Sequence, residues 1–304
     1  MAHYPSKSAT TEKNVAMRFE APETVEAAIN LMAQESGESR PLAGGTDLLV
    51  QLKTGRVQPD LIVDLKRIPS MTAITSEGGG FRIGGAVPAA EMLENDALTA
   101  AWPGICEAAH LVGSTQVMGR ASLAGNLCTS SPAADTVPAM AAAGATARIA
   151  GPNGTRDVAV EDVPSGVQKN SLQKGEVVDS IYLPARAERS SDAYLRFIPR
   201  TEMDIAVVGC GVSVTLAEDG TISDAKVALG AVAITVQVVS DAAKAIIGTK
   251  LDDAALDALA SACSAACKPI DDKRGTIAFR TDVAGVLAKR AAKIAYDRAA
   301  GVAA

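Results

Sequence analysis

Histidine and aromatic residues are scarce in this 304-residue chain. It contains two histidines, and Phe, Trp and Tyr together make up 3% of its residues. His3 lies in a polar N-terminal stretch. His110 lies in GICEAAHLVG, where we expect a structural position near the end of a helix. Because histidine is the commonest general base and metal ligand, its scarcity argues against a histidine-based hydrolase or metal enzyme.

The cysteines form no recognisable metal or disulfide pattern. They are odd in number and scattered, and no CxxC motif occurs. Cys263 and Cys267 stand four apart on a predicted helix, but two thiols alone make a poor metal site. We therefore expect reduced, inert thiols, a cytoplasmic location, and no iron–sulfur cluster or zinc in this chain. The cysteines are Cys106, Cys128, Cys210, Cys263 and Cys267.

Long apolar runs and an excess of positive charge are also absent. No stretch approaches the roughly 18 apolar residues that a membrane-spanning helix needs. The 29 Lys and Arg residues are outnumbered by 35 Asp and Glu residues, which argues against a nucleic-acid or anionic-membrane surface. Residues 1–14 are polar and lack the apolar core of a signal peptide, so we expect a disordered lead there.

The pattern along the chain predicts an α+β protein with a change of composition near residue 184. We expect residues 15–184 to mix helices and strands, and residues 185–304 to form a smaller antiparallel sheet with helices. Helices are predicted at 21–37 (with Pro22 in the first turn), 46–55, 89–96, 102–113, 135–144, 252–267 and 276–300. Strands are predicted at 40–45, 60–65, 81–87, 145–151 and 175–184, with two more in 204–233. Residues 113–135 read as a long Gly/Ser/Pro-rich loop.

Ala43-Gly44-Gly45-Thr46-Asp47 lies between a predicted strand and a predicted helix. Backbone N–H groups in such a turn can bind an anion, because glycine lets a phosphate approach closely. The Thr46 hydroxyl could cap the helix or bond a phosphate oxygen. Taken alone, the pattern favours a structural connector over a phosphate-binding loop.

A second stretch of small residues, ASLAGNLCTSSPAAD, occupies residues 121–135. We place Gly125 and Asn126 in a tight turn, surrounded by hydroxyl side chains. Asp135 either caps the next helix or supplies a carboxylate that accepts hydrogen bonds from ligand hydroxyls. Two such turns in one domain suggest two loops that hold one diphosphate.

A dinucleotide-binding Rossmann unit is a poor match. Asp64 follows Gly44 by about twenty residues, where a ribose-binding acid would stand. However, no GxGxxG motif is present, and the predicted helix after Gly45 is too short for a crossover. We interpret Asp64 as a polar strand position.

Several motifs resemble the FAD-binding medium subunits of molybdenum hydroxylases. The resemblance lies in PLAGGTDLLVQLK, LIVDLKRI, GSTQVMGRASLAGNLCTSSPAADTVPAM, GEVVDSIYLP, PRTEMDIAVVGCGVSV and ISDAKVALGAVA. This family includes medium subunits of carbon monoxide dehydrogenases and the flavin domain of xanthine dehydrogenase. The motifs occur in the family's order from about residue 15 onward, so the resemblance covers nearly the whole chain.

The resemblance implies an FAD domain of the p-cresol methylhydroxylase type, in two subdomains, followed by a C-terminal domain. FAD would be noncovalent, since no histidyl anchor is apparent. By position in the family's motifs, residues 42–48 would form the diphosphate loop and residues 122–126 a second loop that holds the cofactor. Asp135 would lie on its ribityl or ribose side. Val178, Arg196, Arg200, Asp204 and Ile205 would lie at the flavin ring, where the two arginines would favour an anionic reduced flavin. The implied residues are Leu42, Ala43, Gly44, Gly45, Thr46, Asp47, Leu48, Val112, Ser122, Leu123, Ala124, Gly125, Asn126, Asp135, Val178, Arg196, Arg200, Asp204 and Ile205.

Two positions depart from the family's pattern. Asp47 adds a negative charge beside the expected diphosphate, so its carboxylate should point away or cap the following helix. Ala124 replaces the first glycine of the usual pair, which requires a negative φ at that residue.

The family implies an electron-transfer subunit of a heterotrimer. The partners would be a large subunit with a molybdopterin cofactor and a small subunit with two [2Fe-2S] clusters, arranged as a dimer of heterotrimers. Electrons would pass through the clusters to FAD and then to an external acceptor. Two alternatives remain open: a free-standing FAD-dependent oxidoreductase of the same fold, and a flavin-free scaffold subunit.

Overall fold

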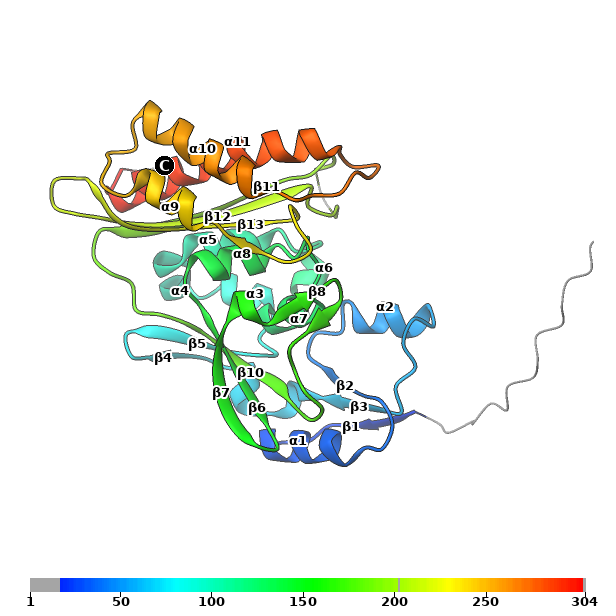
Figure 1. Cartoon of the computed structure of the whole chain (residues 1–304). Helices are drawn as coiled ribbons and strands as arrows, with labels where there is room; N and C mark the ends of the chain where they lie inside the picture. The colour runs from blue at the N-terminus through cyan, green and yellow to red at the C-terminus, as the bar shows by residue number, and fades with distance from the viewer. Residues whose placement is uncertain (1–16, 202, 303–304) are drawn as a thin grey trace, which may run out of the picture.

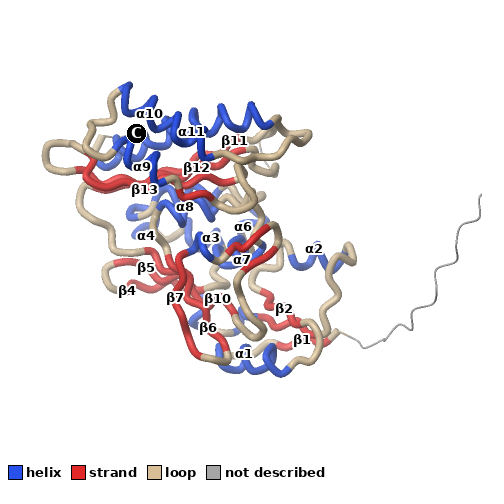
Figure 2. Tube along the Cα trace, in the orientation of Figure 1, coloured by secondary structure: helices blue, strands red, loops and turns tan. Residues whose placement is uncertain are grey.

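The computed structural model describes residues 17–201 and 203–302. The predicted lead at 1–14 therefore lies outside the described residues. The chain contains both helices and strands, and the strands form several separate sheets, so the α+β prediction is confirmed (Figures 1 and 2). In this described part, no helix is both long and apolar enough to cross a membrane.

A small parallel sheet and two helices form the N-terminal unit. Its strand order is β1-β3-β2. Helix α1 begins after Thr24, whose side-chain oxygen accepts a hydrogen bond from the N–H of Ala27. Pro22 therefore precedes the helix, and its predicted place in the first turn is wrong. The elements are β1 (Arg18–Glu20), α1 (Val25–Gln34), β2 (Ser39–Leu42), α2 (Leu48–Lys53), β3 (Leu61–Asp64) and the 3-10 turns η1 (Leu65–Arg67) and η2 (Pro69–Thr72).

A five-stranded antiparallel sheet follows, in the order β4-β5-β10-β6-β7. Its strands come from two distant parts of the sequence, because β10 pairs with β5 on one side and β6 on the other. The strands are β4 (Ile74–Glu77), β5 (Gly80–Gly84), β6 (Thr146–Gly151), β7 (Gly154–Ala159) and β10 (Val177–Leu183). Between β7 and β10 lie η3 (Val160–Asp162), β8 (Pro164–Gly166) and β9 (Lys169–Asn170).

Short helices fill the sequence between β5 and β6. They are α3 (Ala89–Leu93), α4 (Asp96–Ala101), α5 (Pro103–His110), α6 (Thr115–Met118), α7 (Leu123–Thr129) and α8 (Thr136–Ala142). The predicted loop at 113–135 thus contains two helices, and that prediction is wrong. Ser122 begins α7 by accepting a hydrogen bond from the N–H of Gly125. The glycine and serine content of this segment is typical of loops, but α7 is stabilised by its Ser122 cap and by its buried face.

The C-terminal sheet is antiparallel and has helices on both faces (Figure 1). Helix α11 packs on β11 and β12 from one side, whereas α8 packs on β12 and β13 from the other. A Cβ atom at Gly211 would stand 2.6 Å from the carbonyl oxygen of Pro138, so α8 lies directly on the sheet backbone. The elements are β11 (Ser190–Phe197), β12 (Val208–Leu216), β13 (Ile222–Gly230), β14 (Gln237–Val238), α9 (Ser240–Ile246), α10 (Asp253–Ala266) and α11 (Ile277–Ala299).

Candidate functional site

A cavity of about 460 Å³ opens between the turn after β2, the start of α7 and the β8–β10 region. This volume lies within the usual range for small-molecule and cofactor sites. Many of the residues implied by the resemblance line it, although they come from four separate parts of the sequence. They are Leu42, Ala43, Gly44, Gly45, Thr46, Asp47, Leu48, Val112, Ser122, Ala124, Gly125, Asn126 and Val178.

The first glycine turn presents free backbone donors at this cavity. Among the described residues, no acceptor is found for the N–H groups of Gly44, Gly45 or Thr46. Gly45 has a φ of +81°, which glycine adopts without strain. A Cβ atom at Gly44 would stand 1.7 Å from the carbonyl oxygen of Arg120, so this turn packs against the backbone that leads into α7. The turn is therefore both a close structural contact and a source of donors for an anion.

Gly125 and Asn126 lie in the first turn of helix α7 and not in the tight turn that was predicted for them. Ala124 is buried and helical, so its φ is negative, as its replacement of glycine requires. The Asn126 side-chain oxygen accepts hydrogen bonds from the N–H and the hydroxyl of Thr136, at 3.2 and 2.6 Å. Asn126 therefore ties α7 to α8 while it also lines the cavity.

Asp47 does not cap α2, although it precedes that helix. Its carboxylate instead accepts a hydrogen bond of 3.0 Å from the Thr129 hydroxyl. Of the two alternatives expected for Asp47, the helix cap is therefore wrong. The contact joins the two cavity-lining segments through their side chains.

Asp135 and Arg196 lie outside the cavity lining and bind each other. Asp135 precedes α8 without capping it, and its carboxylate accepts hydrogen bonds from the Tyr194 hydroxyl at 3.0 Å and from Arg196 at 2.8 Å. The cap alternative for Asp135 is therefore wrong. Burial raises the pKa of Asp135 to about 6, although Arg196 and Tyr194 both act to lower it. The Nε atom of Arg196 is buried and has no acceptor among the described residues. Leu123 is buried beside the cavity and does not line it.

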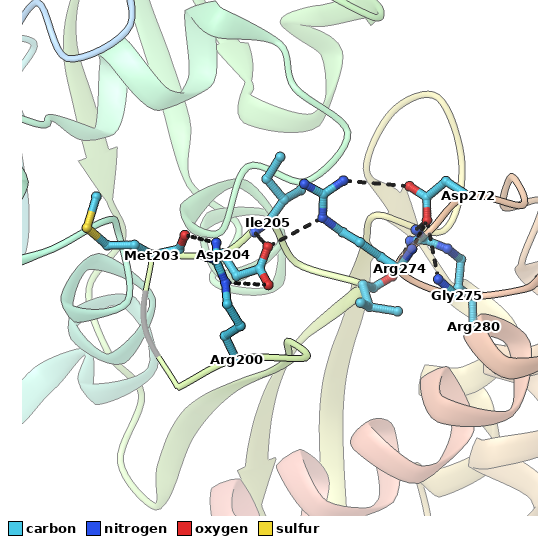
Figure 3. Close-up of polar contacts among 9 residues, drawn as sticks. Arg200, Met203, Asp204, Ile205, Asp272, Arg274, Gly275 and Arg280 are labelled. Atoms are coloured by element: carbon cyan, nitrogen blue, oxygen red, sulfur yellow. Dashed lines mark hydrogen bonds and ion pairs between the residues drawn. The ribbon is translucent and has the colours of Figure 1, made fainter.

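Arg200, Asp204 and Ile205 lie on the loop between β11 and β12, also outside the cavity lining (Figure 3). Asp204 accepts hydrogen bonds from the N–H of Ile205, from Arg200 and from Arg274. The Ile205 N–H, and then the two guanidinium groups, hold the pKa of Asp204 below its usual value. Ile205 itself is exposed.

The same figure shows how this loop is joined to α11. Arg274 pairs with Asp204 and with Asp272, and Asp272 also accepts a hydrogen bond of 2.8 Å from Arg280 (Figure 3). Arg280 is buried and donates to the carbonyl oxygen of Val207 at 2.6 Å. Alternating charges thus run from the loop surface into the C-terminal core.

Several residues of the cavity were not predicted from the sequence. Thr129 and Cys128 end α7, and Asn170 donates a hydrogen bond of 3.0 Å to the carbonyl oxygen of Cys128. No local pattern marks the residues that follow, which belong to β9 and the segments around it and approach α7 through contacts such as that of the Gln168 N–H with the carbonyl oxygen of Ser130. Those residues are Gln168, Asn170, Leu172, Gln173, Lys174 and Glu176.

The cysteines are free, and Cys106, Cys210 and Cys263 are buried. Burial raises the pKa of the Cys128 thiol to about 12, and those of the other cysteines are raised as well. Within residues 17–201 and 203–302, no group of three or more His, Cys, Asp or Glu side chains could hold a metal ion. The expectation of reduced, inert thiols stays a prediction.

Two family models match consecutive parts of the chain. Residues 15–186 match the FAD binding domain in molybdopterin dehydrogenase, and residues 193–295 match the CO dehydrogenase flavoprotein C-terminal domain. The carbon monoxide dehydrogenase medium chain of Hydrogenophaga pseudoflava is 32% identical over 93% of this chain and 99% of its own length. A putative xanthine dehydrogenase FAD-binding subunit of Escherichia coli K12 is 28% identical over 91% of this chain and 95% of its own.

Solved structures agree with these matches. A chain of the reconstituted CO dehydrogenase from Oligotropha carboxidovorans superposes with a TM-score of 0.89 at 30% identity, over 93% of this chain and 98% of that one. The family that the motifs suggested is therefore confirmed over both domains. The chain belongs to the FAD-binding medium subunits of molybdenum hydroxylases and is a flavoprotein component of an oxidoreductase.

Proposed function

We propose that this chain is the electron-transfer subunit of a heterotrimer and that the cavity holds the diphosphate of a noncovalent FAD. One observation carries the assignment of the site. The first glycine turn has N–H groups without an acceptor among the described residues. This turn and the start of α7 line the same cavity, although nearly 80 residues separate them. Unpaired backbone donors in a glycine turn suit a phosphate better than they suit an apolar ligand.

The residues of this chain bind and orient the cofactor. Gly44, Gly45 and Thr46 would donate to the diphosphate, and Val178, which lines the same cavity, would contact the ring. Asp204 and Ile205, on the loop between β11 and β12, would contact the ring. When bound, the flavin supplies the change from two-electron to one-electron transfer. The positive charges of Arg196 and Arg200 are offset by Asp135 and Asp204, so their effect on a reduced flavin is smaller than isolated cations would give.

We further propose the partners and the domain limits that the family implies. The relatives are medium chains of carbon monoxide dehydrogenases and FAD-binding subunits of xanthine dehydrogenases. By analogy, a large molybdopterin subunit and a small subunit with two [2Fe-2S] clusters would complete a cytoplasmic heterotrimer, which would assemble as a dimer of heterotrimers. The FAD-binding domain would span residues 15–184 and the C-terminal domain residues 185–304.

The test is to purify the chain alone and with its co-purifying partners and to record visible spectra. We expect a flavin spectrum that acid releases into solution, together with iron and molybdenum only when the partners are present. A colourless chain would support the scaffold alternative. Full turnover of an organic substrate by the isolated chain would overturn the subunit assignment in favour of a free-standing oxidoreductase.

A further inference from the structure

Lys66 lies directly behind the first glycine turn. It follows the end of β3, while Ala43 follows the end of the neighbouring strand β2. The Lys66 ammonium donates hydrogen bonds to the Ala43 carbonyl oxygen at 2.9 Å and to the Asp64 carboxylate at 2.6 Å. The same carboxylate oxygen also accepts a hydrogen bond of 3.0 Å from the Lys66 N–H, which fixes the base of the lysine side chain. Asp64, which does not line the cavity, thus holds the Lys66 side chain toward the turn.

The contact fixes the orientation of one peptide group. All described peptide bonds are trans, so the Ala43 carbonyl and the Gly44 N–H point in opposite directions. Ala43 and Gly44 line the cavity, whereas Lys66 does not. With its carbonyl held by Lys66, this peptide therefore directs the Gly44 N–H toward the cavity.

Without Lys66, this peptide could reverse. Rotation of the Ala43–Gly44 peptide changes only ψ of Ala43 and φ of Gly44, and glycine tolerates nearly all values of φ. The reversed peptide would place a carbonyl oxygen, with its partial negative charge, at the position where the diphosphate binds. A charge-assisted hydrogen bond is strong enough to decide between two such orientations.

We propose that Lys66, aimed by Asp64, is a positioning residue that holds the Ala43–Gly44 peptide in the orientation that binds the FAD diphosphate. This proposal rests on the proposed function, because it assumes that the cavity receives the diphosphate. It assigns Lys66 no contact with FAD.

Affinity of the full-length, FAD-depleted chain for FAD and for ADP tests the proposal. FAD is followed by quenching of flavin fluorescence, and ADP by competition with it. We expect Lys66→Met to raise both dissociation constants by about 10- to 100-fold, the loss expected for a hydrogen bond to a charged group. Lys66→Arg should restore most of the affinity, because a guanidinium can also donate to the carbonyl and the carboxylate.

Arg67→Met is the matched control. It removes the same charge from the next, exposed residue, so its dissociation constants should stay within about twofold of the unmutated chain. Equal affinities for Lys66→Met and Arg67→Met would overturn the proposal. Failure of the unmutated chain to bind FAD would instead overturn the proposed function.

A second measurement does not depend on whether Lys66→Met folds. In the unmutated chain with ¹⁵N-labelled glycine, saturating ADP should shift the Gly44 amide proton strongly downfield, while adenosine should not. A Gly44 signal that ADP leaves unchanged would overturn the proposal.

Discussion

The Thr129 hydroxyl donates a hydrogen bond to the Asp47 carboxylate over 3.0 Å, between residues 82 positions apart in the sequence. The same hydroxyl lies 2.9 Å from the carbonyl oxygen of Gly125. It has one hydrogen, and a hydrogen bond to the charged carboxylate is stronger than one to the carbonyl. This contact accounts for a carboxylate at a site proposed for a diphosphate. It holds the negative charge of Asp47 toward α7 and so reduces the repulsion between that charge and the diphosphate.

Thr129→Val should weaken FAD binding by about tenfold, because the Asp47 carboxylate would lose its donor and be free to turn toward the diphosphate. Flavin fluorescence quenching would measure the dissociation constant. Thr129→Ser keeps the hydroxyl and should bind as the unmutated chain does. In the double variant Asp47→Asn with Thr129→Val, most of the loss should disappear. A double variant as weak as Thr129→Val alone would show that the carboxylate is not the cause.

Gly45→Val should abolish FAD binding and leave the fold largely intact. At φ +81° the new side chain is strained, and its Cβ would stand 2.9 Å from Leu42 Cδ1 at the cavity wall. Gly55→Val is the matched control, since Gly55 has a φ of +69° and a Cβ there meets nothing within 4 Å. Both variants should lose a similar stability of about 1–2 kcal/mol, measured by chemical denaturation. Stoichiometric flavin in purified Gly45→Val would contradict the loop assignment.

Stability should depend on pH through Asp135. Its pKa in the folded chain is about 6, against an ordinary value of 3.8. Between pH about 4 and 6 the folded state therefore binds more protons than the unfolded state, and its free energy of unfolding falls as the pH rises. Asp135→Asn should remove this contribution, which is on the order of 2 to 3 kcal/mol across the window.

Denaturation curves at several pH values would measure this effect as the difference between Asp135→Asn and the unmutated chain. As the pH rises from 4 to 7, the free energy of unfolding of Asp135→Asn should increase relative to that of the unmutated chain. Asp157→Asn is the opposing control, because Arg148 lowers the pKa of Asp157 and its contribution is lost as the pH falls. A difference for Asp135→Asn that is constant with pH would refute the assignment of the raised pKa.

Arg274→Met should loosen the loop between β11 and β12. It removes the ion pairs of Arg274 with Asp204 and Asp272, which are partly exposed and so individually weak. We expect amide hydrogen exchange at Ile205, whose N–H binds Asp204, to become about two- to fivefold faster. Lys273→Met, at the exposed neighbour, should not change this rate. Equal rates in the two variants would show that Arg274 does not hold the loop.

The elements predicted correctly from the sequence are those whose signals are local. The strand–glycine–helix pattern around Gly44 and Gly45 and the two long C-terminal helices are examples. The helices α6 and α7 were missed because Gly119, Gly125 and the serines near them resemble loop composition. Their stability comes from buried faces such as those of Met118 and Leu127 and from the Ser122 cap.

The partners of individual side chains could not be predicted in the same way. Asp47 and Asp135 both precede helices, where a capping role is the local expectation. Each instead binds a residue that the fold brings from far along the chain, Thr129 in one case and Arg196 in the other. A single sequence carries no signal for such pairs, because they depend on how the sheets are assembled.

The placement of α8 has a consequence for synthesis on the ribosome. Every residue of α8 from Thr136 to Ala142 is buried, and β12 and β13, which cover one side of it, are translated more than 60 residues later. Until those strands emerge, the growing chain exposes an apolar helix that a chaperone or another nascent chain could bind. A pause in translation before β12 and β13 have left the ribosome would prolong that exposure, whereas a pause after both strands have emerged would not.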